Sequence, residues 1–72
     1  MNRFQLARYR AGISLKDAAE RAGVGRTTLS RIENGHIERP SAEVVHGLAA
    51  AYEIEVDVLL GLKPMPERKA AA

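Results

Sequence analysis

The sequence predicts an all-α fold of five short helices, and three observations lead to it. The composition favours helices, since alanine, leucine, glutamate and arginine are abundant. Apolar residues recur at three- and four-residue spacing, which puts them on one face of a helix. The Asn34-Gly35 pair is not flanked by alternating strands, so it indicates a helix end rather than a hairpin turn. The expected helices cover residues 2–11, 15–22, 26–33, 42–52 and 56–60.

Length and composition limit the chain to one small domain. A chain of 72 residues buries a modest core, which we expect within residues 1–62. Residues 63–72, with two prolines and an alanine end, are expected to form a mobile tail. The chain has no cysteine and no apolar run of signal-peptide or membrane length, and His36 and His46 have no further ligands at metal spacing. We therefore expect a cytoplasmic protein without cofactor, metal or membrane partner.

The first helix, residues 2–11, is expected to stop at Gly12. We expect Arg3 and Arg10 to face solvent or a phosphate. An apolar stripe with Arg8 beside it is formed by Phe4, Ala7 and Ala11.

Capping residues predict the ends of the next two helices. Ser14, with Asp17 three residues later, resembles a capping box, in which each side chain bonds a free amide of the first turn. Gly23 suits the left-handed residue that ends a helix, and Gly25 is a weaker N-cap than serine for the helix that follows. The sequence therefore predicts two helices separated by a three-residue turn.

The faces of these two helices differ in size. The first turns inward a row of mostly small side chains, Leu15, Ala18, Ala19 and Ala22. The second has branched residues at the same spacing, Thr28, Leu29 and Ile32. Alanines let two backbones cross closely, and Ala19 is the expected crossing point. The outer face of the second helix carries two arginines and three hydroxyl groups, which is the plan of a helix-turn-helix unit.

Charge is segregated along the chain. Residues 1–35 hold seven Lys or Arg against three Asp or Glu, residues 36–62 hold one against five, and residues 63–72 hold three against one. A polyanion would be attracted to the first part, which contains the two-helix unit, and repelled by the second. The alternative is a solvated surface whose charges segregate by chance.

The order of residues through this unit resembles the Cro/cI-type (XRE-like) helix-turn-helix family of phage and bacterial transcriptional regulators. The resemblance covers roughly residues 4–61 and rests on the segment SRIENG, residues 30–35, together with Ala19, Gly23, Val24, Leu29 and Ile32. It implies a compact five-helix, lambda-repressor-like DNA-binding domain. Two residues depart from the family pattern: Leu15 stands where a glutamine usually holds a DNA phosphate, and Gly25 stands where a serine is usual.

The resemblance also implies a sequence-specific regulator that binds double-stranded DNA as a homodimer on a palindromic operator, with repression as the expected mode. Because Leu29 and Ile32 occupy the inner stripe, the expected base-reading residues are Arg26, Thr27, Ser30 and Arg31. Side chains and main-chain amides are expected to hold the DNA backbone at Arg10, Leu15, Lys16, Thr28, Asn34, Gly35 and Arg39. Arg8 and Glu33 are expected to form an ion pair that ties the first helix to the recognition helix.

Two other classes of function differ from this expectation. The alternative is an antitoxin or another protein-interaction module with secondary DNA binding, which co-purification with a second chain would reveal. An enzyme is not expected, since the sequence has no paired carboxylates, no Ser/His/Asp constellation and no phosphate-binding loop.

The last two predicted helices complete the core, and the final one has more apolar residues than it can bury. Pro40 and Ser41 precede the helix of residues 42–52, whose inward face is Val45, Leu48, Ala49 and Tyr52. The helix of residues 56–60, ended by Gly61, is too short to bury all of Val56, Val58, Leu59, Leu60 and Leu62. We expect a second copy to cover this surplus through a dimer interface of Val56, Val58, Leu59 and Leu62. In the alternative, Leu62 folds back over the surplus.

Overall fold

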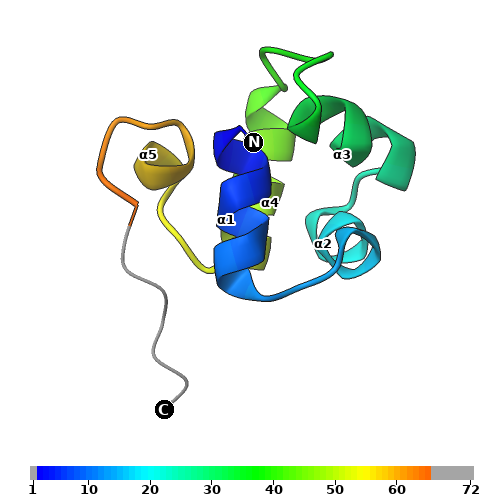
Figure 1. The fold of residues 1–72 in the computed structure, drawn as a ribbon, viewed down its shortest axis with the longest axis horizontal. Coiled ribbons are helices and arrows are strands. Elements are labelled where there is room, and N and C mark those ends of the chain that lie inside the picture. The colour runs from blue at the N-terminus through cyan, green and yellow to red at the C-terminus, as the bar shows by residue number, and fades with distance from the viewer. Residues whose placement is uncertain (1, 66–72) are drawn as a thin grey trace.

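The computed structural model of this protein describes residues 2–65, which fold into five helices with no strand among them (Figure 1). α1 lies in front of α4 in this view, with α2 and α3 on one side and α5 on the other. The fold class is the one that the sequence predicts. The helices are α1 (Arg3–Ala11), α2 (Leu15–Ala22), α3 (Arg26–Glu33), α4 (Ala42–Tyr52) and α5 (Val56–Leu59).

Side-chain caps begin three of these helices. Each capping oxygen accepts a hydrogen bond of 3.0 to 3.2 Å from the main-chain amide three residues later, and the capping residues are Asn2, Ser14 and Ser41. Asn2 has extended backbone angles, so α1 begins at Arg3, one residue later than predicted. α5 ends at Leu59, one residue earlier than predicted, with Leu60 as its C-cap. The other predicted boundaries agree with the structure.

The core lies between α2 and α4, which make the most extensive helix contact, and the other helices close around it. Every residue predicted to face inward from α4 is buried, and so is Ala51. Thr28 is exposed, so its prediction as an inward residue is wrong. The buried apolar residues are Phe4, Ala7, Ala18, Ala19, Leu29, Ile32, Val45, Leu48, Ala49, Ala51, Tyr52, Val58 and Leu59.

A glycine sets how closely α2 and α4 approach. A Cβ atom added to Gly47 would lie 2.6 Å from the main-chain oxygen of Ala22, a distance that real side chains do not show. The helices therefore meet backbone to backbone at this point. The role of Gly47 was not predicted, because a glycine inside a helical pattern indicates only a slightly less stable helix.

α5 corrects the predicted dimer surface. Val58 and Leu59 are 8% and 0% exposed, because α5 packs with them against α1 and α4. The expectation that these two residues are free to contact a second copy is therefore wrong. The exposed apolar side chains at this end are Leu60 and Leu62, at 44% and 73%, so Leu62 does not fold back over the surplus.

The chain stays against the body of the domain for three residues beyond the expected boundary. Lys63 Nζ donates to Glu55 Oε2 at 2.8 Å on the surface, and Met65 is half-buried against the core. The predicted tail from residue 66 onward lies outside the described residues. In the described part, the helices are too short and too polar to cross a bilayer.

Candidate nucleic-acid interface

The turn between α2 and α3 is built by two glycines with different backbones. Gly23 is left-handed, with a φ of 73°, and ends α2, while the amide of Val24 donates to the Ala19 carbonyl at 3.0 Å. Gly25 has extended angles and gives α3 no side-chain cap. A Cβ on Gly25 would meet only the Thr28 hydroxyl oxygen, at 3.9 Å, so a serine would fit there. The departure from the family pattern at Gly25 therefore removes a capping hydrogen bond rather than relieving a clash.

α3 presents a polar outer face over a buried inner stripe. Leu29 and Ile32 are 0% and 1% exposed. The predicted base-reading residues Arg26, Thr27 and Arg31 are exposed, as is Thr28, while Ser30 is half-buried and its hydroxyl accepts from Asn34 Nδ2 at 3.3 Å. A helix with this division of faces can lay its outer side chains into a major groove while its inner face stays in the core.

The ion pair implied by the family resemblance joins α1 to the end of α3. Arg8 Nε donates to Glu33 Oε2 at 2.8 Å and Arg8 Nη2 donates to Glu33 Oε1 at 3.0 Å, so the pair is bidentate. The hydrogen bond to Glu33 raises the pKa of Arg8, against the opposing effect of burial. Arg8 also donates to the carbonyl of Ile13 at 3.2 Å and lies over the ring of Tyr9, 5.0 Å from its centre. These contacts hold one guanidinium between three segments of the chain.

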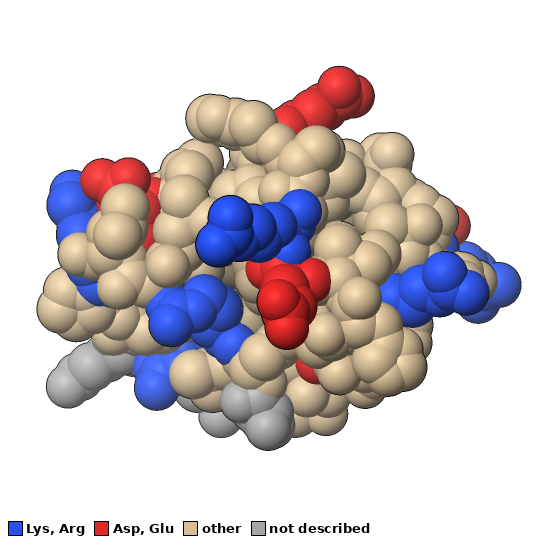
Figure 2. Space-filling view, turned by 90° about the horizontal axis from the view of Figure 1, so that it is seen from above, with Lys and Arg blue, Asp and Glu red and all other residues tan. Residues whose placement is uncertain are grey.

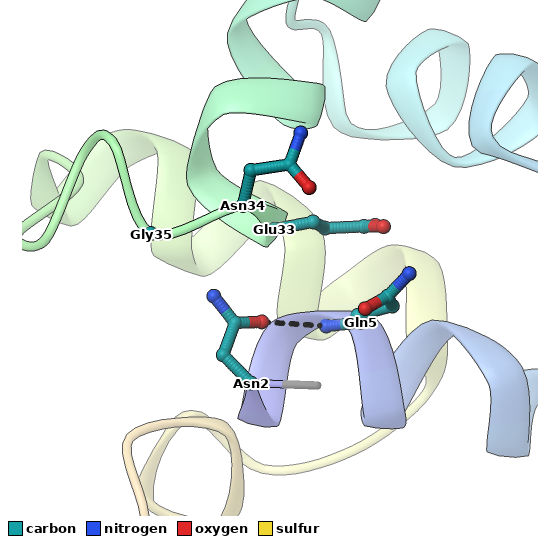
Figure 3. Close-up of a pocket in the computed structure, with 5 residues that line it drawn as sticks. All are labelled: Asn2, Gln5, Glu33, Asn34 and Gly35. Carbon is teal, nitrogen blue, oxygen red and sulfur yellow. Dashed lines mark hydrogen bonds between the residues drawn. The ribbon is translucent and has the colours of Figure 1, made fainter.

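An open polar hollow of about 450 Å³ lies beside this pair, between the start of α1 and the end of α3 (Figure 3). Asn2 and Gln5 line it from the cap and first turn of α1, and Glu33, Asn34 and Gly35 line it from the last residue of α3 and the turn that follows. Asn2 and Gln5 were not predicted to be members of this region. An asparagine followed by a glutamine three residues later is a capping pattern that would have marked the helix start, but not the contact with α3.

The main-chain anchors predicted around the end of α3 are already used within the protein. The amide of Asn34 donates to the Ser30 carbonyl at 2.9 Å, and that of Gly35 donates to the Ile32 carbonyl at 3.2 Å. The prediction that these amides are open to a phosphate is therefore wrong. At the start of α2, in contrast, the amides of Leu15 and Lys16 donate no hydrogen bond to the described residues.

The side chains predicted to hold the DNA backbone lie on the surface, with one exception. Arg10, Lys16 and Arg39 are exposed, and Leu15 is half-buried against the core. Leucine at position 15 therefore adds apolar packing to the core, whereas the family resemblance implies a glutamine at this position.

Charged groups are more mixed in space than along the sequence. Figure 2 shows the molecule from above the view of Figure 1. Lysine and arginine side chains mark the end of this face that lies toward α2 and α3, while basic and acidic side chains stand together at its centre and toward α5. Among residues 2–65, no three His, Cys, Asp or Glu side chains gather as metal ligands would, and His36 and His46 are both exposed.

Comparison with known proteins agrees with this geometry. A family model described as a helix-turn-helix domain matches residues 2–60. Two relatives, each described as an uncharacterized HTH-type transcriptional regulator and each from a strain of Mycobacterium tuberculosis, are 38% identical to this chain over 52 residues. The aligned stretch makes up 72% of this chain and 36% of each relative. No solved structure matches the chain.

Proposed function

This chain belongs to the helix-turn-helix domain family, and we propose that it is a sequence-specific DNA-binding regulator that represses transcription from a palindromic operator. The observation that carries the proposal is the division of α3 into a buried stripe and an exposed face with Arg26, Thr27 and Arg31. Arg26 stands at the start of α3, where a guanidinium enters the major groove and bonds two acceptors of a guanine. Thr27 bonds a base edge or contacts a thymine methyl group, and Arg31, one turn further, ranks second for base reading. No enzymatic activity is part of the proposal, and the cytoplasm is the proposed location.

We assign the contacts to the DNA phosphate backbone to groups that lie on the surface of the protein. The amides of Leu15 and Lys16 at the start of α2 suit a phosphate, because they lie at the positive end of the helix. The side chains of Lys16, Arg10 and Arg39 add charge, and Thr28 and Asn34 add polar groups. The substitution Leu15→Gln examines this scheme. Tighter binding to specific and random DNA alike would mean that the family's side-chain anchor is missing here.

The homodimer is part of the proposal because the contact between one helix-turn-helix domain and DNA is too small for selective binding. A single domain buries about 600–1,000 Å² of protein surface against DNA. The two domains of a dimer reach two half-sites roughly 34 Å apart, which doubles the contact. Leu60 and Leu62, with the half-buried Val56, supply the apolar surface for a second copy. We expect Leu62→Asp to shift the protein toward monomer in sedimentation and to weaken operator binding more than half-site binding. Tyr9→Ser, which removes a similarly exposed ring from α1, should leave the association unchanged. A dimer that is unchanged by Leu62→Asp would contradict this interface.

Operator selection tests the function itself. Wild-type protein is used to enrich a random double-stranded library at moderate salt, and the enriched sequence is compared with a scrambled duplex. Arg26→Ala should lower the specific affinity by roughly 1–3 kcal/mol and relax the preference at one base pair. Arg21→Ala removes the same charge from the exposed end of α2 and serves as its control. Equal losses on specific and scrambled DNA would make Arg26 a phosphate contact, and no enrichment of any sequence would overturn the proposed function.

A further inference from the structure

The side chain of Asn2 makes two hydrogen bonds that join two helices. Its Oδ1 accepts from the amide of Gln5 at 3.0 Å and so caps α1 (Figure 3). Its Nδ2 donates to the main-chain oxygen of Ile32, in the last turn of α3, at 2.7 Å. The two partners require an acceptor and a donor, and among the short polar side chains that cap helices only asparagine presents both on one rigid, planar group.

The second of these bonds acts on the helix that carries the base-reading face. α3 is eight residues long, and its start is fixed by the turn that follows Gly23. Its end is fixed from α1 at two places: Asn2 holds the Ile32 carbonyl, and Arg8 holds the Glu33 carboxylate. The Arg8 contact runs through two long side chains, whereas the Asn2 contact reaches the backbone of α3 directly. The Asn2 bond therefore restrains the position of the helix itself rather than that of one of its side chains.

We propose that Asn2 is a positioning residue for DNA recognition, which sets the angle of α3 through its bond to Ile32. This inference rests on the proposed function, since a change in the angle of α3 matters only if α3 reads bases. A helix end that moves by about 1 Å takes its outer side chains out of hydrogen-bonding range of the base edges, but it leaves the charge seen by phosphates unchanged. We call the bond from Asn2 to the Ile32 carbonyl the clamp. Loss of the clamp should therefore lower the preference for the operator over random DNA more than it lowers the affinity for random DNA.

Two variants separate the clamp from the cap. Asn2→Ser keeps a capping oxygen for Gln5 and keeps the charge, but serine is too short to reach Ile32 while capping. Asn2→Ala removes both bonds. A third variant, Ala50→Gly, destabilises the exposed side of α4 without touching α1 or α3 and controls for lower stability alone.

The measured quantities are the ratio of operator affinity to random-DNA affinity, at a temperature where every variant is folded, and amide hydrogen exchange without DNA. We expect Asn2→Ser and Asn2→Ala to lower the affinity ratio by a similar factor, roughly two- to tenfold, which is the usual worth of one hydrogen bond. Ala50→Gly should leave the ratio unchanged. Amides in the last turn of α3 should exchange faster in Asn2→Ser than in wild type.

A wild-type ratio for Asn2→Ser, or a loss that follows stability across all three variants, would overturn the positioning role and leave Asn2 as a cap only. Unchanged exchange at the end of α3 in Asn2→Ser would overturn the clamp. If wild type itself prefers no DNA sequence, the proposed function has failed, whereas the exchange measurement still decides whether the Asn2 bond restrains α3.

Discussion

The two helices of the reading unit are held in different ways. α2 lies against α4 through apolar side chains and through a point where Gly47 admits the backbone of Ala22. α3 lies against α1 with polar bonds at its end, from Asn2 to the Ile32 carbonyl and from Arg8 to Glu33. Close apolar packing constrains two helices through the shapes of their faces, while directional bonds tie particular atoms of one helix to the other. The supporting helix is therefore placed by shape, whereas the helix with the exposed polar face adds hydrogen bonds at its end to the apolar packing of Leu29 and Ile32.

Removal of one member of the Arg8–Glu33 ion pair should lower the stability of the protein more than any other change considered below. The Arg8 and Glu33 side chains are 12% and 4% exposed, so Glu33→Ala leaves a guanidinium with little access to water and without the carboxylate that balances its charge. We expect the free energy of unfolding to fall by about 3 kcal/mol, measured by urea denaturation.

A double-mutant cycle with Arg8→Ala isolates the pair from other effects of each substitution. Coupling of about 1 kcal/mol or more is expected, because the two groups contact each other directly. If the two losses simply add, the pair does not stabilise the fold, and the end of α3 depends on Asn2 alone.

The apolar contact is tested by Gly47→Ala. Helix propensity alone would favour alanine by roughly 1 kcal/mol. Because the added methyl group would lie 2.6 Å from a main-chain oxygen, α2 must move away from α4, and we expect a net loss of about 2 kcal/mol of stability. Thermal unfolding monitored by circular dichroism gives the sign directly. A more stable Gly47→Ala protein would mean that the two helices can separate without loss of packing.

Sequence patterns predicted what depends on neighbours along the chain. Ser14 and Gly23 act as the caps that their types favour, and the inward stripe of α4 follows from its three- and four-residue spacing. The division of α3 into Leu29 and Ile32 inside and Arg26 and Arg31 outside follows from the same rule. Spacing within one helix is enough for such predictions, since the core needs only one apolar face from each helix.

Contacts between distant segments could not be predicted in the same way. The bond from Asn2 to Ile32 joins residues 30 positions apart, and the fit of Gly47 to Ala22 depends on the crossing of α2 and α4. Near α5 the sequence revealed that some apolar residues must be exposed, but not which ones. The packing of α5 against α1 and α4 decides that Leu59 is buried and Leu62 is not.

Tyr52 lies where the apolar and polar contacts meet. It is 4% exposed, its hydroxyl has no hydrogen-bond partner among the described residues, and the charges of Arg8 and Glu33 act on it. A buried hydroxyl without a partner is destabilising, so Tyr52→Phe should raise the free energy of unfolding by about 1 kcal/mol at neutral pH. A loss of stability in the same urea experiment would show instead that the hydroxyl is bonded in solution and belongs to the polar contact.

The smallest expected effect is a loss of stability at alkaline pH, which Tyr52 causes. Burial raises the pKa of Tyr52 above its ordinary value of 10.0, and the negative charge of Glu33 raises it further. A group whose pKa is raised in the folded state contributes stability that is complete below the unfolded pKa and declines above it, because the unfolded chain ionises first. We therefore expect wild-type stability to lose roughly 0.8 kcal/mol from this residue between pH 8 and pH 10.5, and Tyr52→Phe to lack this part of the decline. Arg8 keeps its charge throughout this interval, since the hydrogen bond to Glu33 raises the pKa of a guanidinium that is already protonated at these pH values. If the free energies of unfolding of wild type and Tyr52→Phe fall in parallel as the pH rises, water reaches the Tyr52 hydroxyl. The side chains around this hydroxyl would then not exclude solvent.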